Sequence, residues 1–450
     1  REDMQTMVQA VRKYENTIND RGKRNLFITI YALSVLSIIL SPFIGKIFVF
    51  FATFLFACSL FFLPSLYSYG LLYGLFPFAN IFKLSPESLS FLTICEILLL
   101  MKIAFVLLMK RNRIKCNVAL LLGLTLTVLH IVIFSSQIDY LGIIKLLVRI
   151  LLVAYYLRSL RSCENGIQSI KMIGYCLSVG MLVMMLLSQN GAYMNAVSGY
   201  LRIVQYDSSG DLIRNGGLMD DPNYCALAII VSLAFLTVLY YYQLVKNEYW
   251  LLVVPLFLLG FTTYSKSYFL TASAFVILLL LCVLFPKHKF LAIVLCFITV
   301  GAVSAMMSGQ VEIINKILLR FNTAGVYTGR DELNHIYIDY IFKNTKVLFF
   351  GEGFDVTSLS GVNNVHNLYI EMLFRLGGIG SLFFVVAVIG CFPKRLSKFK
   401  LVNYIPAIFI TVMYMALAGM DSYGLFYYIL LAGVSALFIT NVNENSAITA

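Results

Sequence analysis

Residues 222–243, PNYCALAIIVSLAFLTVLYYYQ, form an uncharged stretch that is long enough to cross a membrane as one helix. A helix rises about 1.5 Å per residue and the hydrocarbon core is about 30 Å thick, so roughly 20 apolar residues suffice. Similar stretches of roughly 18 to 25 residues recur from near Leu26 to near Thr440. We therefore predict an all-α fold, a polytopic transmembrane helical bundle of about 12–14 spans.

Composition favours the same class of fold. Hydrophobic residues make up 60% of the chain and charged residues 12%, and the mean hydropathy is +0.86. Soluble domains carry about twice that share of charge, so lipid is the main solvent of this protein. We expect a cytoplasmic basic segment (1–25), transmembrane helices (26–307) with an extracytoplasmic loop (189–221), a large extracytoplasmic loop (308–365), further transmembrane helices (366–441) and a cytoplasmic tail (442–450).

The net charge of +12 does not indicate a nucleic-acid partner, because the basic residues form short clusters between apolar stretches. Under the positive-inside rule such clusters stay in the cytoplasm. Alternation of the spans places all four on one side: Lys110–Lys115, Arg158–Arg161, Lys287–Lys289 and Lys394–Lys400. The nine cysteines lack metal-ligand spacing, and we expect neither a metal site nor a cofactor.

The N-terminal part leaves two questions open. The orientation predicts spans near 26–41, 45–63, 89–109, 116–135, 138–157, 169–188, 222–243, 249–265, 267–285, 288–307, 366–391, 401–419 and 423–441. A cytoplasmic N-terminus requires Tyr67–Phe82 to cross as well, which gives about 14 spans. Residues 1–20 carry apolar side chains at helical spacing and form either a membrane-surface helix or a frayed tail.

Polar chemistry gathers on the predicted outer face, where three spans begin. Asp221 is a suitable N-cap and Pro222 suits the first helical position. Lys266 lies in the turn Tyr264–Ser267, beside the start of the next inward-running span, and an Asn can cap the span that begins near His366. Helix N-termini carry partial positive charge and unpaired N–H groups, so three of them on one face suit an anion such as a diphosphate.

Arg330 lies in the large loop, within the capping-box sequence Thr328-Gly-Arg-Asp331, and apolar residues then continue at helical spacing. A positive side chain in the first turn opposes the helix dipole, so its presence needs another reason. Either an external anionic ligand or a salt bridge with Asp331 or Glu332 supplies one.

Several short motifs together resemble the O-antigen polymerase and ligase superfamily. In chain order they are Arg214…Gly217…Asp221-Pro-Asn223, Ser265-Lys266-Ser267, Thr328-Gly329-Arg330, Gly351-Glu352-Gly353 and His366-Asn367-Leu-Tyr369. The resemblance runs from Gly191 to Gly380, and the N-terminal spans match only in hydrophobic character. The family often has Ser-Arg where this chain has Ser265-Lys266, which keeps the charge but loses bidentate geometry.

The resemblance implies a metal-independent, inverting glycosyltransferase with a GT-C-like fold in a bacterial cytoplasmic membrane, its active site facing the periplasm or the exterior. Such an enzyme polymerises undecaprenyl-diphosphate-linked oligosaccharide repeat units into O-antigen or capsular polysaccharide. Besides the lipid bilayer, the partners it implies are a flippase and a chain-length regulator of the same pathway.

The chemistry implied needs a base for the acceptor hydroxyl and cations for the leaving diphosphate. His366 suits the base, because an imidazole with a pKa near 6.5 accepts a proton near neutral pH, although a capping or interfacial histidine is the alternative. We expect His366 and Arg330 to be catalytic. The diphosphate or glycan would be bound by Arg214, Lys266, Asn223, Asn367 and Arg375, of which the two asparagines cap and position.

Charged residues within spans need a partner or water. Lys145 and Arg149 share a helix face and either contact lipid phosphate or pair with Glu96. Glu371 and Arg375 are spaced for an ion pair, but they also follow His366 by one and two turns, so Arg375 is a candidate for the site floor.

Three other functions are alternatives to the polymerisation of lipid-linked glycans. A flippase for the same glycans predicts an internal repeat with broken helices, and the sequence has no convincing repeat. An intramembrane protease is disfavoured because the sequence has neither HExxH nor GxSG. A ligase of the same superfamily, which transfers finished glycan to another acceptor, predicts nearly the same motifs.

Overall fold

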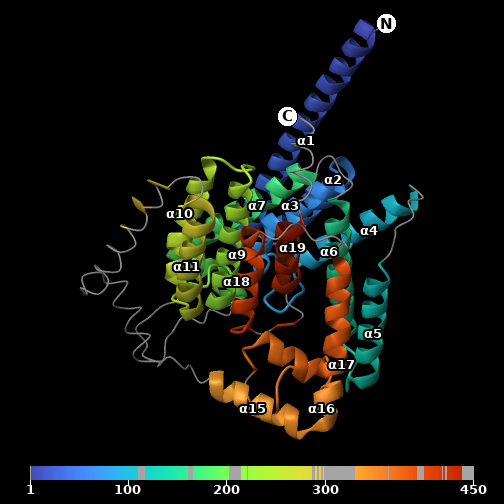
Figure 1. Ribbon diagram of the computed structural model, residues 1–450, viewed down its shortest axis with the longest axis vertical. Helices are drawn as coiled ribbons and strands as arrows, with labels where there is room; N and C mark the ends of the chain where they lie inside the picture. The colour runs from blue at the N-terminus through green and yellow to red at the C-terminus, as the bar shows by residue number, and fades with distance from the viewer. Residues whose placement is uncertain are drawn as a thin grey trace.

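The computed structural model describes residues 2–109, 117–160, 166–201, 214–219, 221–285, 289–290, 293–294, 297, 330–362, 364–392, 400–417, 419–420 and 423–437, with side chains for all of these except 2–20, 423 and 437. This part of the chain consists of helices and loops, without strands (Figure 1). Its α-helices are α1 (Glu2–Ile44), α2 (Ile47–Phe62), α3 (Ser65–Leu75), α4 (Phe91–Met109), α5 (Val118–Phe134), α6 (Tyr140–Ser159), α7 (Gly166–Leu187), α8 (Gly191–Val197), α9 (Pro222–Tyr241), α10 (Glu248–Gly260), α11 (Lys266–Leu279), α15 (Arg330–Lys343), α16 (Thr345–Phe350), α17 (Leu368–Cys391), α18 (Ile405–Tyr414) and α19 (Tyr423–Leu437). Short 3-10 or π turns are η1 (Phe76–Phe78), η2 (Ser198–Tyr200), η3 (Phe261–Thr263), η4 (Leu280–Leu284) and η5 (Leu401–Tyr404).

Helix α9 is the axis of the bundle and contacts α7, α10, α11, α18 and α19 (Figure 1). Every residue from Cys225 to Leu239 is buried. A helix that is apolar on all sides belongs in the interior, whereas one with a single apolar stripe borders water. The stretch 222–243 is therefore protein core along most of its length.

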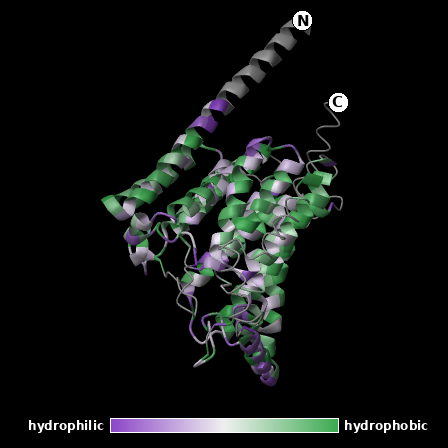
Figure 2. Ribbon diagram, turned by 90° about the vertical axis from the view of Figure 1, so that its left-hand side faces the viewer, coloured by the Kyte–Doolittle hydropathy of each residue, from purple (hydrophilic) through white to green (hydrophobic). Residues whose placement is uncertain are grey.

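The outer helices carry the surface that suits lipid. Seven described helices are long and apolar enough to cross a membrane, and five shorter ones are also apolar. Large apolar side chains are exposed on these helices, such as Phe54 and Phe61 on α2 and Ile133 on α5. Hydrophobic residues predominate along most of the described helices (Figure 2). Exposure of this much apolar surface is unfavourable in water and favourable in hydrocarbon. The prediction of a polytopic helical bundle is confirmed, while the span expected near 288–307 lies almost wholly outside the described residues.

One end of the bundle gathers the segments that flank the basic loops. The carbonyl of Gly390, near the end of α17, accepts hydrogen bonds from Asn117 and Arg158, both of 3.0 Å. Asn117 precedes α5 and Arg158 ends α6, so described residues that flank three of the basic clusters in the sequence meet at this end. The fourth follows η4, which packs on η5 at the same end, beside Lys400. We call this the basic end; the side of the membrane that it faces stays a prediction.

The stretch Tyr67–Phe82, for which the sequence left open whether it crosses, lies largely in a short buried helix and the turn that follows it. Helix α3 has 11 residues and is about 16 Å long, roughly half the hydrocarbon thickness. All side chains from Leu66 to Phe78 are buried, and α3 packs closely on α7. A Cβ on Gly74 would lie 2.9 Å from the Cβ of Cys176, so glycine permits this approach. The apolar composition of the stretch therefore reflects burial in protein.

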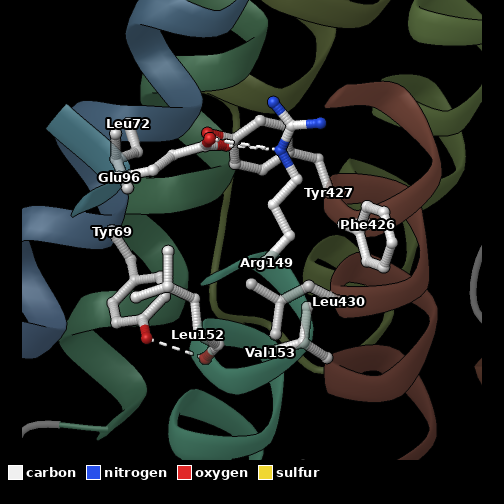
Figure 3. A pocket seen from close by; sticks show the side chains of 9 residues that line it. All are labelled: Tyr69, Leu72, Glu96, Arg149, Leu152, Val153, Phe426, Tyr427 and Leu430. Atoms are coloured by element: carbon white, nitrogen blue, oxygen red, sulfur yellow. Dashed lines mark hydrogen bonds and ion pairs between the residues drawn. The ribbon is translucent and has the colours of Figure 1, made fainter. Parts of the chain in front are cut away.

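A buried ion pair joins α4 to α6 inside the bundle (Figure 3). Nε of Arg149 lies 3.1 Å from Oε2 of Glu96, and both side chains are almost fully buried. The hydroxyl of Tyr427 on α19 donates to the same carboxylate at 2.9 Å. Of the two partners predicted for Arg149, lipid phosphate or Glu96, the structure has Glu96.

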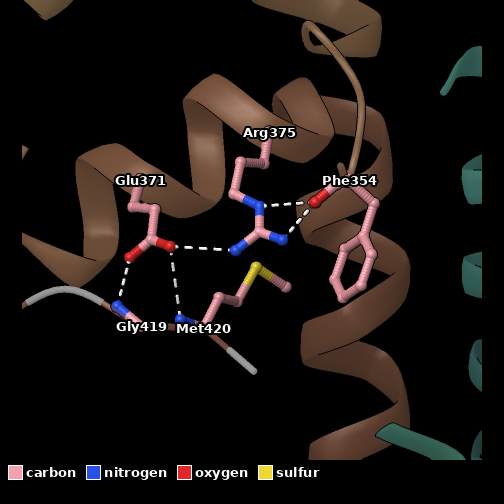
Figure 4. A network of polar contacts seen from close by, with 5 residues as sticks. All are labelled: Phe354, Glu371, Arg375, Gly419 and Met420. Atoms are coloured by element: carbon pink, nitrogen blue, oxygen red, sulfur yellow. Dashed lines mark hydrogen bonds and ion pairs between the residues drawn. The ribbon is translucent and has the colours of Figure 1, made fainter. Parts of the chain in front are cut away.

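Helix α17 is broken at Gly377, which has φ 64° and ψ −177°. The part before the break runs across the end of the part after it, as Figure 4 shows. The sequence predicted one straight span over 366–391, with Glu371 and Arg375 progressively deeper in the membrane. Because of the break, these two residues instead lie in a segment that runs across the end of the bundle.

Candidate functional site

The end opposite the basic end, which we call the loop end, is where α9, α11, α15 and α17 begin. Asp221 caps α9 by accepting a 2.6 Å bond from the amide of Asn223, and Pro222 is the first helical residue. Asn367 caps α17 and accepts from the amides of Tyr369 and Ile370. The predicted caps Asp221 and Asn367 are thus confirmed. Helix N-termini concentrate partial positive charge, so the loop end suits an anion.

Arg214 is held against the first turn of α9 and the turn before α11. Its Nη2 donates to Oδ1 of Asn223 at 3.2 Å, and its Nε donates to the carbonyl of Thr263 at 3.4 Å. Oδ1 of Asn223 also accepts from Oγ of Ser265 at 2.8 Å. Asn223 is 6% exposed, so it positions Arg214 and Ser265 from within, as the sequence predicted for this asparagine.

Lys266 is the first residue of α11 and is half-buried beside this cluster. The turn before it contains Tyr264 in the left-handed region, with φ 45° and ψ 32°. A non-glycine residue in this region is uncommon, and such strain concentrates at functional sites. Ser265 then caps α11 by accepting from the amide of Tyr268. The sequence motif Ser265-Lys266 therefore lies next to Arg214 and Asn223.

Arg330 begins α15, whose buried face carries Tyr337 and Ile341. The loop helix predicted after Arg330 is confirmed, although Thr328 and Gly329 lie outside the described residues. Nη1 of Arg330 donates a 3.0 Å bond to the carbonyl of Ala416 in the turn after α18. Neither of the two explanations for Arg330 from the sequence, an anionic ligand or a salt bridge, included this partner. Every residue type has a backbone carbonyl, so the sequence does not reveal such a contact.

His366 is half-buried just before the cap of α17. Burial lowers the pKa of its imidazole, and the positive charge of Arg330 lowers it further. The carboxylates of Asp221 and Glu371 act in the opposite direction and raise this pKa. These charges belong to α15, to the cap of α9 and to α17. His366 therefore interacts electrostatically with charged side chains from three separate segments.

Glu371 and Arg375 form a second buried pair, at 3.0 Å, in the first part of α17 (Figure 4). Both Nε and Nη2 of Arg375 also donate to the carbonyl of Phe354, and its guanidinium lies 4.5 Å from the centre of the Phe354 ring. The Glu371 carboxylate accepts from the amides of Gly419 and Met420. The ion pair is confirmed; with Arg375 only 3% exposed, its expected role in ligand binding stays a prediction.

The Gly351-Glu352-Gly353 segment closes the break in α17. The amides of Glu352 and Gly353 donate to the carbonyls of Phe374 and Arg375, which lie just before the break at Gly377. The amide of Gly351 donates to Val347. These N–H groups are therefore occupied within the protein, and the segment serves as a turn without open donors for a phosphate.

Sequence reasoning found the cations and the histidine of the loop end but missed the turn after α18. Ala416, Gly419 and Met420 contribute backbone groups alone, and no residue type is required for such contacts. Within the described part of the chain, His, Cys, Asp and Glu form no group of three that could hold a metal ion. Comparisons of the chain with models of protein families, with curated proteins and with solved structures found no match.

Proposed function

We propose that this protein is a membrane glycosyltransferase that polymerises lipid-diphosphate-linked oligosaccharide repeat units at its loop end. The observation that carries the proposal is the convergence there of four helix N-termini with Arg214, Lys266, Arg330 and a half-buried His366. Positive helix ends and cationic side chains together favour a diphosphate. The resemblance of the motifs to those of O-antigen polymerases and ligases is the reason for proposing a glycan as the group that is transferred.

In the proposed reaction a hydroxyl oxygen of the acceptor sugar attacks the anomeric carbon of the donor. The bond between that carbon and the lipid diphosphate breaks, the configuration inverts, and the diphosphate leaves with the bonding electron pair. His366 accepts the hydroxyl proton, for which a neutral imidazole is required. Its lowered pKa keeps it neutral near pH 7.

The cations have separate tasks in this scheme. Arg214 is fixed by Asn223 and the Thr263 carbonyl, so it suits a phosphate whose place does not change between donor and product. Arg330 shares the surroundings of His366 and suits the oxygen on which charge develops as the bond breaks. Lys266 adds a charge at the N-terminus of α11.

A transport function is the second candidate, and the break in α17 favours it, because discontinuous membrane helices bind substrates in many transporters. The break lies at the loop end, however, and is closed by the 351–353 segment. The glycosyltransferase proposal uses more of the polar groups present at the site.

The proposal is tested with purified protein and a lipid-diphosphate-linked repeat unit from the source organism. We expect a ladder of products from the wild type and none from His366→Ala or Arg330→Ala. His335→Ala, which removes an exposed histidine from α15, is the matched control and should retain the ladder. A single transfer to a different acceptor would identify a ligase. Movement of labelled lipid-linked substrate across the bilayer without transfer would replace the enzyme by a transporter.

A further inference from the structure

Glu371 stands at the junction between α17 and the turn that joins α18 to α19, of which Met415, Ala416, Leu417, Gly419 and Met420 are described. Its Oε2 accepts from the amide of Gly419 at 2.6 Å and its Oε1 from the amide of Met420 at 3.4 Å. The side chain is 6% exposed. A buried carboxylate that accepts amide hydrogen bonds holds the donating backbone strongly, because such bonds are charge-assisted.

The same turn holds Arg330. Nη1 of Arg330 donates to the carbonyl of Ala416, three positions before Gly419 in the turn. A continuous set of contacts therefore runs from the Glu371 carboxylate through the turn to the Arg330 guanidinium. His366, five positions before Glu371, is under the influence of both charges.

We propose that Glu371 is a positioning residue: by fixing the α18–α19 turn it holds Arg330 beside His366. The inference rests on the proposed function for what Arg330 does, and goes beyond it in assigning a residue that acts through the turn. Arg375 compensates the buried charge of Glu371 and extends the contact to the carbonyl of Phe354.

The pair Glu96–Arg149 provides an internal comparison. It is also a buried Glu–Arg pair, although it joins α4 to α6 whereas Glu371 and Arg375 both belong to α17, and Tyr427 donates to it as the turn amides donate to Glu371. Its surroundings are the side chains of Tyr69, Leu72, Leu152, Val153, Phe426 and Leu430, and no proposed site residue is among them. Loss of the Glu96 pair therefore reports the structural cost of removing a buried ion pair, without displacement of Arg330.

The test replaces each pair by apolar residues of similar length, as Glu371→Met/Arg375→Met and as Glu96→Met/Arg149→Met. Removal of both partners avoids an unpaired buried charge, so both double variants are expected to fold. Glu371→Gln is the single variant. For each we would measure thermal unfolding, hydrogen–deuterium exchange of the Gly419 and Met420 amides and of the first half of α15, and kcat and KM for the lipid-linked donor.

In Glu371→Met/Arg375→Met we expect the turn amides to exchange at least about tenfold faster, because they lose hydrogen bonds to a charged acceptor. The kcat should fall about 10- to 100-fold, since a small displacement of a catalytic group has effects of this size, while KM changes less than about threefold. Glu96→Met/Arg149→Met should keep both the slow exchange and the kcat.

In Glu371→Gln we also expect the acid limb of the pH–rate profile to move to lower pH, because one carboxylate that faces His366 is lost while Asp221 and Arg330 remain. A folded Glu371→Met/Arg375→Met protein with wild-type kcat, or with unchanged exchange in the turn and α15, would overturn the proposal. If the wild type transfers no glycan, the proposed function fails, and the exchange data alone decide whether Glu371 fixes the turn and α15.

Discussion

Nη2 of Arg214 donates a 3.2 Å hydrogen bond to Oδ1 of Asn223, so the first turn of α9 fixes a cation that precedes it in the chain. If Arg214 binds the donor diphosphate, Asn223 contributes through Arg214. Arg214→Ala and Asn223→Ala should each lower kcat/KM for the donor about 10- to 100-fold. The double variant should lose little more than Arg214→Ala alone, and a double-mutant cycle measures this. Fully additive losses would show that the two side chains act independently.

The pKa of His366 should respond in opposite directions to two neighbours. Its pKa lies below the ordinary value of about 6.5, so the neutral base, and with it the activity, should persist below that pH and be lost as the pH falls through the lowered pKa. Arg330→Gln removes a positive charge and should raise the pKa; Glu371→Gln removes a negative charge and should lower it further.

NMR titration of labelled histidine would measure both shifts, with His366→Ala to assign the signal. Lys343→Gln is the control, because it removes an exposed positive charge from the far end of α15 and should leave this pKa unchanged. Shifts of the same sign in the Arg330 and Glu371 variants would contradict the described arrangement of charges.

Gly377 should tolerate no side chain. Its φ of 64° disfavours other residues, and a Cβ there would lie 2.5 Å from the amide nitrogen of Gly351. We expect Gly377→Ala to lower the free energy of unfolding by about 2–4 kcal/mol. Gly361 also has a positive φ, of 75°, but faces open space, so Gly361→Ala should cost only about 1–2 kcal/mol. Thermal unfolding of the two variants would separate strain from steric overlap, and equal losses would rule out the close contact.

The Glu96–Arg149 pair should follow the thermodynamics of buried ion pairs. Arg149→Met leaves Glu96 buried without its cation and should destabilise the protein by about 3–5 kcal/mol. Replacement of both residues by Met should restore most of that loss. Chemical unfolding of the three variants tests this, and a double variant no more stable than Arg149→Met would show that the pair contributes net stability.

Most of the bundle could be predicted from the sequence because uninterrupted apolar stretches have few alternatives. The caps of α9 and α17 could be predicted from Asp221-Pro222 and Asn367. A short polar side chain just before an apolar run can accept a hydrogen bond from an unpaired amide in the first turn of the helix. The break at Gly377 could not be predicted, because glycine is also common where intact membrane helices pack closely. Its conformation depends on contacts with the 351–353 segment, which is distant in sequence.

The candidate site was predicted in part for a similar reason. Charged side chains at span entrances, such as Arg214 and Lys266, are conspicuous in an apolar chain. The arrangement that fixes them depends on backbone carbonyls and amides, as with Arg330 and Ala416, and any residue type provides those groups. The same limit applies to Tyr264, whose left-handed conformation is unusual for its residue type.

The segment 351–353 supplies amides that complete α17 across its break, and the chain between them contains exposed positions at Ser360 and Gly361. A polypeptide divided at that point would leave the donors on one piece and the matching carbonyls on the other. The two pieces also share the packing of α5 against the second part of α17. Two co-expressed halves should therefore associate and reassemble, because backbone amides of one half form hydrogen bonds with the carbonyls of a helix in the other half.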